Sequence, residues 1–305
     1  MLPAMKRLLA CLLILSCHEA PQKSAETATA AKPAATASTA ATAAKPMTLE
    51  QEIDQWHATR RASLTREDGW LSLVGLEWLN PGDNEVKLPA NPPVTTHFIL
   101  KDGKVAMTQP SGKGAPMVLR DDTDPKGPQV VHIGSFRFNV IRRGDKFGIR
   151  MKDANAKTRT EFKGLDYFPT NPKWRVEAKF QPFTPAKKVT ITNVLGMTSE
   201  EIAPGELVFT VDGKEYRIEP ILEQGETDLF IIFKDTTSGK ETYPAARYVY
   251  AKPPGPDGKT IIDFNKAYNP PCAFTPYATC PLPPQQNRLP VPVDAGEKKY
   301  AGGHA

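Results

Sequence analysis

Three two-residue turn signals constrain the fold of this chain more than any other feature of its sequence. Asp102-Gly103, Gly144-Asp145 and Asp212-Gly213 each separate two strand-like runs, in THFILKDGKVAMT, FRFNVIRRGDKFGIRM and GELVFTVDGKEYRIEP. Such dipeptides close tight hairpins between antiparallel strands, because Gly and Asp tolerate the positive φ angles that these loops need. Strands joined by hairpins rather than helices predict a mainly β fold, built as an antiparallel sandwich or an open barrel.

Further strands are expected between and after these hairpins. The strand-like runs cover residues 174–180, 189–194, 229–233, 247–250 and 260–264. The sequence also has 30 prolines, which suit a loop-rich β protein, and several of them gather in a Pro-rich segment near the C-terminus. We therefore expect a β domain over residues 47–298, with a candidate seam between two subdomains near residues 154–172.

One amphipathic helix is expected at the start of this domain. Thr48 and Gln51 form a capping-box pattern, in which each side chain can bond the backbone N–H of the other residue. The apolar residues that follow recur at near-helical spacing: Leu49, Ile53, Trp56 and Leu64. The pattern stops at Asp68-Gly69, so the sequence predicts a helix that lies across the beginning of the β domain.

The N-terminus has the pattern of an export signal. Lys6 and Arg7 precede the apolar run Leu8–Leu15, which is too short to span a bilayer as a helix. Cys17 follows this run closely, as the lipidated cysteine does in bacterial lipoprotein signals, although the residue two positions before it is not small. The sequence predicts a signal over residues 1–17 with lipidation at Cys17, and a plain secretory signal is the alternative.

The segment between the signal and the domain has the composition of a tether. Residues 18–46 are rich in Ala, Thr, Lys and Pro and have too little large apolar surface to offset the entropy of ordering. We expect this linker, and the tail at residues 299–305, to be disordered. Together with the signal, the linker predicts an exported protein that a lipid anchor holds at a membrane of the bacterial cell envelope, facing the periplasm.

Composition and motifs exclude several classes of function. The formal net charge is +5, but Lys and Arg are scattered among the acids and form no stripe, so nucleic acid is not an expected partner. The sequence has no G-x-S-x-G elbow, no H-E-x-x-H zinc helix and no glycine-rich phosphate loop. Its five histidines are scattered, so we predict neither a metal nor a cofactor.

Cys272 and Cys280 are the two ends of the stretch CAFTPYATC, which has further prolines on both sides. The other two cysteines, Cys11 and Cys17, belong to the signal, and an exported protein with one remaining pair usually joins it. A zinc site would need two more ligands, and none is close in sequence. A redox pair usually has the closer C-x-x-C spacing. A structural disulfide between Cys272 and Cys280 is therefore expected ahead of these two alternatives.

Polar side chains gather near the C-terminus, in DTTSGKETYPAARYVY and IIDFNKAYNPPC. These runs supply Asp235, Glu241, Tyr243, Arg247, Asp263, Asn265, Tyr268 and Asn269. Asp263 and Asn265 are two apart and so share one face of a strand, and Arg247 is expected to face Asp263 across adjacent antiparallel strands. Such a cluster predicts either a polar pocket or a buried hydrogen-bond network that holds the C-terminal loop in place.

Several long motifs resemble a known family. DGWLSLVGLEWL, GLDYFPTNPKWRV, FKDTTSGKETYPAARYVY and DFNKAYNPPCAFTPYATCPLPPQQNRLPVPVDAGEK are similar to the domain of unknown function 1684, from about Trp56 to Lys298. The resemblance implies a shared fold and a signature C-terminal segment, but no reaction. It also implies that the following residues belong to the family's signature: Arg247, Asp263, Asn265, Asn269, Cys272, Cys280, Asn287 and Glu297.

Two functions remain open from the sequence. The first is a ligand-binding, partner-binding or structural β domain whose polar C-terminal residues form the site, namely Tyr243, Arg247, Asp263, Asn265, Asn269, Asn287 and Glu297. Its partner would be a small molecule or an envelope component, and it would meet the membrane only through the lipid anchor. The alternative is a hydrolase-like envelope enzyme, in which Asp263 or Glu297 acts as a general base and Tyr243 or Arg247 stabilises charge.

Overall fold

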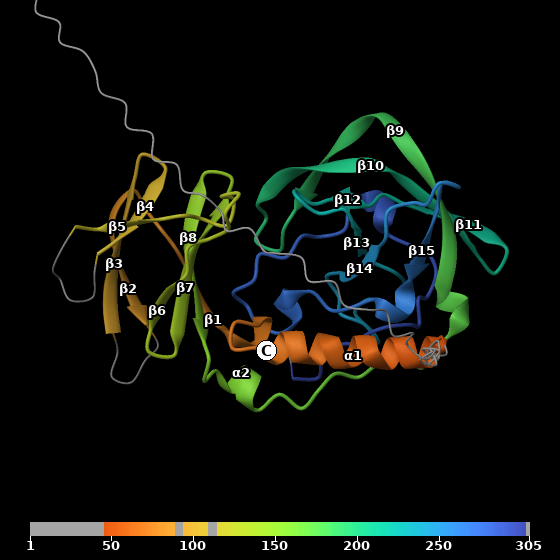
Figure 1. Cartoon of the computed structure of the whole chain (residues 1–305), viewed down its shortest axis with the longest axis horizontal. Coiled ribbons are helices and arrows are strands. Elements are labelled where there is room, and N and C mark those ends of the chain that lie inside the picture. The colour runs from red at the N-terminus through yellow and green to blue at the C-terminus, as the bar shows by residue number, and fades with distance from the viewer. Residues whose placement is uncertain (1–45, 89–93, 109–114, 303–305) are drawn as a thin grey trace, which may run out of the picture. The chain divides into compact units, whose positions relative to one another are not determined.

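The computed structural model describes residues 46–88, 94–108 and 115–302 (Figure 1). The chain is mainly β, and all its strand ladders are antiparallel, as predicted. The predicted signal, the lipidation site at Cys17 and nearly all of the predicted linker lie outside the described residues. Among the described residues, no helix is both long and apolar enough to cross a membrane.

The predicted N-terminal helix is confirmed as α1 (Leu49–Thr65). The capping box is present, since Thr48 N donates to Gln51 Oε1 at 2.9 Å and Gln51 N donates to Thr48 Oγ1 at 3.3 Å. Ile53 and Leu64 are buried on the face of α1 that meets the domain. A short second helix, α2 (Lys157–Thr160), follows the first two sheets and lies within the predicted seam.

Two four-stranded sheets form a sandwich in the first part of the domain. One sheet has the order β1-β8-β7-β6 and the other the order β2-β3-β4-β5. Their strands are β1 (Leu73–Trp78), β2 (Gly82–Leu88), β3 (Val94–Lys101), β4 (Lys104–Met107), β5 (Met117–Leu119), β6 (Val131–Ile133), β7 (Phe136–Arg143) and β8 (Lys146–Asp153). Alternate residues of both sheets, including Phe98 and Phe138, meet in one apolar core.

The second part of the domain is built from a four-stranded and a three-stranded sheet. The orders are β11-β10-β9-β15 and β12-β13-β14. Their strands are β9 (Arg175–Thr192), β10 (Thr198–Val211), β11 (Lys214–Ile218), β12 (Ile221–Leu222), β13 (Leu229–Phe233), β14 (Arg247–Ala251) and β15 (Lys259–Asp263). Both sheets contribute to a second core, in which Phe209, Phe233 and Phe264 pack edge to face or tilted against one another.

The three predicted hairpins are all confirmed. They join β3 to β4, β7 to β8 and β10 to β11 through two-residue loops. Asp102 and Gly103 both have positive φ, as do Asp212 and Gly213, so these loops need residues that tolerate the left-handed region. The two strands predicted at residues 174–180 and 189–194 are instead one long strand, β9, because β10 pairs with it on both sides of a register shift.

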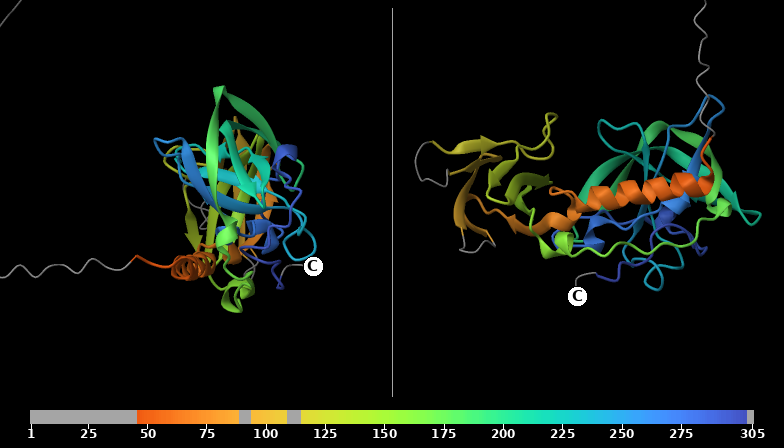
Figure 2. Two further views of the ribbon diagram at one scale, coloured as in Figure 1. Left: turned by 90° about the vertical axis from the view of Figure 1, so that its right-hand side faces the viewer. Right: turned by 60° about the horizontal axis from the view of Figure 1, so that its bottom comes forward.

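The chain after β15 forms few ladders and is held by side chains. It contains short 3-10 turns at Phe264–Lys266, Pro271–Ala273 and Gln285–Asn287. The right-hand view of Figure 2 shows this C-terminal segment, in blue, beside α1, and Arg60 of α1 is bonded to Glu297 and to Asn269 O. The expectation that the tail is disordered from residue 299 is wrong for its first residues. Lys299 N donates to Glu241 O, and the Tyr300 ring packs against Phe162 and Phe274.

Candidate binding site

Arg247, the central residue of the predicted polar site, is enclosed in the second core. It is 1% exposed, and its Nη2 donates to Val293 O at 2.7 Å and to Asp235 Oδ1 at 3.2 Å, while Nη1 donates to Ala295 O. Asp235 in turn accepts from Val293 N at 2.8 Å. The guanidinium therefore ties β14 to the C-terminal segment and is closed to a ligand.

The expected pairing of Arg247 with Asp263 is wrong. β14 pairs with β13, whereas β15 pairs with β9, so the two strands are not neighbours in one ladder. Asp263 lies opposite Arg175 in the β9–β15 register, and its Oδ1 accepts from Asn265 N and Nδ2. The turn at residues 253–258 therefore links β14 to β15 without joining the two strands in a ladder.

Glu297 and Asn269 form a second buried group with α1. Glu297 is 0% exposed and accepts from Arg60 Nε at 2.8 Å and from Asn269 N at 2.7 Å. Arg60 Nη2 donates to Asn269 O, and Asn269 Nδ2 donates to Lys298 O. This carboxylate is therefore occupied by the helix and by the backbone that it holds.

The remaining predicted site residues also bind backbone. Asn265 exchanges two hydrogen bonds with the backbone of Asn171. Asn287 accepts from Glu219 N and donates to Glu219 O and to Ile232 O. The Tyr243 hydroxyl donates to Cys272 O at 2.9 Å. The bonds of these three side chains fix loops in place, as buried polar groups must find partners.

Cys272 and Cys280 are free, buried thiols in the structure, so the predicted disulfide is not formed in it. Cys272 N donates to Cys280 Sγ at 3.0 Å, which places the two residues side by side. A hydrogen bond from Cys280 lowers the pKa of the Cys272 thiol, while burial raises the pKa of Cys280. Among the described residues, no group of three or more His, Cys, Asp or Glu side chains is arranged to hold a metal.

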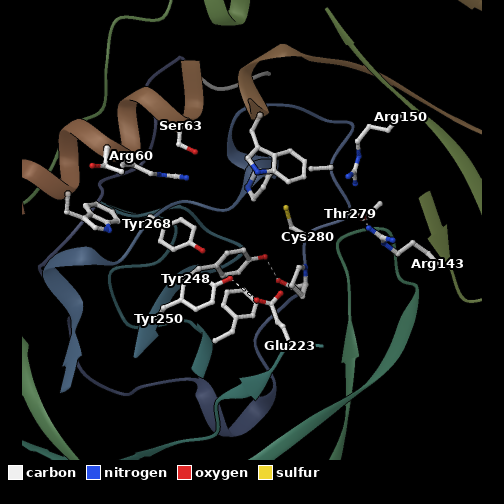
Figure 3. Close-up of a pocket in the computed structure, with 17 residues that line it drawn as sticks. Arg60, Ser63, Arg143, Arg150, Glu223, Tyr248, Tyr250, Tyr268, Thr279 and Cys280 are labelled. Atoms are coloured by element: carbon white, nitrogen blue, oxygen red, sulfur yellow. Dashed lines mark hydrogen bonds between the residues drawn. The ribbon is translucent and has the colours of Figure 1, made fainter. Parts of the chain in front are cut away.

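A pocket of about 520 Å³ lies between α1, β14 and the end of β8 (Figure 3). None of the seven predicted site residues lines it. Asp263 lines a smaller neighbouring pocket of about 430 Å³, where its Oδ2 has no hydrogen bond and Lys266 Nζ lies 3.9 Å away. The larger pocket is lined by Trp56, Thr59, Arg60, Ser63, Trp70, Arg143, Arg150, Glu223, Phe230, Tyr248, Tyr250, Tyr268, Pro271, Ala278, Thr279, Cys280 and Pro281.

Aromatic rings form one wall of this pocket. The Tyr250 ring is stacked on Phe230 at 4.9 Å and lies parallel to Tyr268 at 6.5 Å between centroids. The Arg60 guanidinium lies 4.6 Å from the centre of the Tyr268 ring. Tyr248 and Tyr250 alternate along β14 with Arg247 and therefore face away from the second core.

The other wall carries two arginines from the β7–β8 hairpin. Arg143 is paired, because its Nη1 lies 2.9 Å from Asp122 Oδ2 and its Nε donates to Thr279 Oγ1 at 3.2 Å. Arg150 makes no hydrogen bond or ion pair with any described residue, and its Nε is buried without a partner. Its guanidinium lies 5.1 Å from the centre of the Trp70 ring.

Burial lowers the pKa of Arg150 to about 10, and the neighbouring positive charge of Arg143 contributes to this shift. Both causes disfavour the charged form of the side chain. Glu223 is the only carboxylate that lines the pocket, and it accepts a hydrogen bond from the Tyr250 hydroxyl at 2.8 Å. The pocket therefore combines an aromatic wall with a guanidinium that the protein leaves unneutralised.

The comparisons with known proteins identify a family. The model of the family described as "Protein of unknown function (DUF1684)" matches residues 160–298. The chain belongs to this family. No curated protein matches it. It is also similar to an uncharacterized protein of Haloarcula marismortui with a solution NMR structure, at 32% identity and a TM-score of 0.40, over 47% of this chain and 80% of that one.

The DUF1684 match divides the pocket lining into two groups. The matched range supplies Glu223, Phe230, Tyr248, Tyr250, Tyr268 and the residues around Cys280. Trp56, Arg60, Trp70, Arg143 and Arg150 come from the part of the chain before it. The motif DGWLSLVGLEWL, which suggested a longer resemblance, lies outside the matched residues.

Sequence reasoning missed this pocket because its residues are scattered over the chain. The signal that was available lies in RYVYA, where the period of two separates Tyr248 and Tyr250 from Arg247 and Val249. Tyr250 is 41% exposed, and its ring lies beside Phe230 and Tyr268 rather than singly on the surface, which is the kind of apolar patch that marks a binding site. Arg150 carries no such signal, since an arginine in a strand ordinarily faces solvent.

Proposed function

We propose that this protein binds a small organic molecule in the pocket between α1 and β14. The observation that carries the proposal is the lining. Six aromatic residues line a space of about 520 Å³ near an unneutralised guanidinium, namely Trp56, Trp70, Phe230, Tyr248, Tyr250 and Tyr268. Concave sites with apolar walls and a few converging polar groups are the usual form of small-molecule sites.

Binding is favoured over hydrolysis by the way the polar residues are used. Arg247 and Glu297, which the enzyme hypothesis needs, bind buried partners within the fold. Glu223 is the one carboxylate of the larger pocket, and the Tyr250 hydroxyl is bonded to it. Asp263 keeps an unbonded Oδ2, but it lines the smaller neighbouring pocket and not this one. The lining of the larger pocket thus offers surfaces that hold a ligand, without a free acid–base pair among its own residues.

The proposed setting is the bacterial cell envelope. It rests on the sequence alone: the basic residues and apolar run before Cys17, and the Ala-, Thr- and Pro-rich stretch after it. In an oxidising compartment the adjacent Cys272 and Cys280 would join as a disulfide. Mass spectrometry of the mature N-terminus tests this setting, because a lipid-modified Cys17 is expected and an unmodified Met1 would contradict export.

A neutral fluorescent probe tests the binding function. N-phenyl-1-naphthylamine should bind saturably and quench tryptophan emission by energy transfer, since Trp56 and Trp70 both line the pocket. Tyr250→Ala removes one wall and should weaken binding roughly 3- to 30-fold, the loss expected for an aromatic contact with part of its buried area. Tyr277→Ala is the matched control, because Tyr277 is similarly exposed, at 38%, and lies outside the pocket.

Three outcomes of this titration are informative. A loss confined to Tyr250→Ala supports the site. An equal loss in both tyrosine variants, or the absence of saturable binding to the folded wild-type protein, would contradict the proposed function. Circular dichroism of each variant confirms that the fold is retained before the affinities are compared.

A further inference from the structure

We propose that the ligand of this pocket is an amphipathic anion, whose carboxylate, sulfonate or phosphate group binds Arg150 while its planar apolar body lies against the aromatic wall. This inference rests on the proposed function and names the chemical class of its ligand. Four observations carry it: the position of Arg150 in its sheet, the charge balance around it, its unused donors and the rings nearby.

The position of Arg150 is fixed by the sheet. It lies within β8, where it is in register with Leu76 of β1 on one side and with Asn139 of β7 on the other. Its neighbours Ile149 and Met151 are buried in the core of the sandwich, so Arg150 extends from the opposite face of the sheet. A side chain on a central strand is held in place before a ligand arrives, which lowers the entropy lost on binding.

The charges around Arg150 do not balance. The charge of Arg143 lowers the pKa of Arg150, and the charge of Arg150 in turn lowers the pKa of Lys152. The carboxylate of Asp122 favours the charged form of Arg150, but it is already paired with Arg143, whose Nη1 lies 2.9 Å from Asp122 Oδ2. Lys152 donates to the carbonyl of Asp68 rather than to a carboxylate. Of the two arginines that line this wall of the pocket, Arg143 is paired with Asp122 and Arg150 has no carboxylate partner among the described residues.

The donors of Arg150 are unused. Its buried Nε has no partner, and none of its nitrogen atoms bonds a described residue. A guanidinium presents a planar fork of N–H groups that matches two oxygens of a carboxylate, sulfonate or phosphate. Leaving such a group without an acceptor costs free energy, and an oxyanion would satisfy both the hydrogen bonds and the charge.

The rest of the pocket suits an apolar body. Trp70 packs beside Arg150, and Figure 3 shows Tyr250 and Tyr268 across the space from Arg143 and Arg150. Stacking against these rings is favourable for a planar group. Glu223 would repel a second negative charge, so the anionic group belongs at the Arg150 end and the ligand carries its charge at one end.

Two probes with one ring skeleton separate charge from shape. N-phenyl-1-naphthylamine is neutral, and 8-anilinonaphthalene-1-sulfonate adds a sulfonate to the same rings. The sulfonate should bind the wild-type protein at least tenfold more tightly than the neutral probe, because a charged hydrogen bond is typically worth that much. A rising salt concentration should weaken the binding of the sulfonate and leave the affinity for the neutral probe unchanged.

Arg150→Met should abolish most of this preference. We expect the affinity for the sulfonate to fall roughly tenfold and the affinity for the neutral probe to change less than twofold. Glu223→Gln should raise the sulfonate affinity slightly, because a repelling charge is removed. Arg217→Met is the control for total charge, since Arg217 is a surface residue that lies outside the pocket and pairs with Glu206 and Glu215.

The outcomes distinguish the two proposals. If both probes bind equally well and Arg150→Met changes neither, the anion proposal is overturned while the binding function stands. If neither probe binds saturably, the proposed function fails. If Arg217→Met weakens the sulfonate as much as Arg150→Met does, the preference comes from net charge, which also overturns the assignment to Arg150. Should Arg150→Met fail to fold, the salt dependence of the two probes with the wild-type protein decides the matter.

Discussion

Arg247 and Arg150 both extend from β-strands into the protein, but their surroundings differ in kind. Two nitrogens of Arg247 are bonded to Asp235, Val293 and Ala295, and the side chain is 1% exposed. Arg150 faces a pocket and has no acceptor among the described residues. The Nε atom has no hydrogen-bond partner among these residues in either arginine. The two therefore differ in their Nη atoms, which are bonded only in Arg247, and in the carboxylate of Asp235, which only Arg247 has beside it.

This comparison separates a structural use of arginine from a binding use. Burial lowers the pKa of both guanidinium groups, but only Arg247 has a bonded carboxylate that opposes the shift. Removing one partner of a buried ion pair strands the other charge and destabilises the fold, whereas a largely desolvated charge that has no ion-pair partner is already unfavourable. Titratable groups that their surroundings perturb in this way cluster at functional sites.

The largest expected effect is on the structural side of this comparison. Asp235→Ala leaves Arg247 buried without its carboxylate and should lower the free energy of unfolding by about 3–5 kcal/mol. Urea denaturation followed by circular dichroism measures the loss. The double variant Asp235→Ala/Arg247→Met should recover part of it, since no unpaired charge then remains. A loss below about 1 kcal/mol would show that Arg247 is not held as described.

Arg60 sharpens the comparison because it has both a structural ion pair and a place in the pocket wall. Its Nε is paired with the fully buried Glu297, and its guanidinium lies over Tyr268 at the pocket wall. Arg60→Met should lower the free energy of unfolding by about 3 kcal/mol, since Glu297 loses its cation. It should also lower the affinity for the neutral probe, because the guanidinium no longer lies over Tyr268. Arg61→Met is the neighbouring control on α1. Equal stability of the two variants would contradict the pairing of Arg60 with Glu297.

Oxidation of Cys272 and Cys280 tests whether the edge of the pocket that Cys280 lines can be stabilised by a covalent bond. If oxidation joins them, the short loop that they close should raise the free energy of unfolding by roughly 2–3 kcal/mol. Unfolding is compared with and without a reductant, and Cys272→Ser/Cys280→Ser serves as the control that cannot respond. Two alkylated thiols in protein prepared under oxidising conditions would contradict the disulfide.

The fold was more predictable than the site, for a physical reason. Hairpins at Asp102-Gly103 and Asp212-Gly213 and the Thr48 capping box depend on residues a few positions apart, so the sequence shows them directly. The pairing of Arg247 depends on which strands are neighbours in space. The turn after β14 suggested β15 and Asp263, whereas the ladder joins β14 to β13, and Asp235 lies just beyond β13.

The residues of the candidate site were predictable only in part, for the same physical reason. Asn265, Asn287 and Glu297 stood out because polar residues in a proline-rich segment are conspicuous, and each is bonded to backbone. Arg150 and Trp70 did not stand out, because what distinguishes them is the lack of a partner and a location beside the pocket. Such properties arise only when distant segments are brought together.

The smallest expected effect has the opposite sign to the first. Arg150→Met replaces a half-buried charge that has no carboxylate partner with an apolar side chain of similar length, and it should raise the free energy of unfolding by about 1 kcal/mol. The matched variant Arg247→Met should lower it, because Asp235 then loses its cation. Thermal denaturation at pH 7 in low salt, without ligand, measures both changes.

The pH dependence of this gain follows from the pKa of Arg150, which folding lowers to about 10. Below that pH the side chain is charged in both the folded and the unfolded protein, so the whole penalty is present. Above it the folded protein loses the proton while the unfolded chain keeps it, so wild-type stability rises and the advantage of Arg150→Met shrinks. Unfolding at pH 8 and pH 10.5 should show this convergence. A penalty that stays constant would show that Arg150 keeps its proton at pH 10.5 in the folded protein, and a destabilised Arg150→Met at both pH values would show that the protein itself supplies a partner to Arg150.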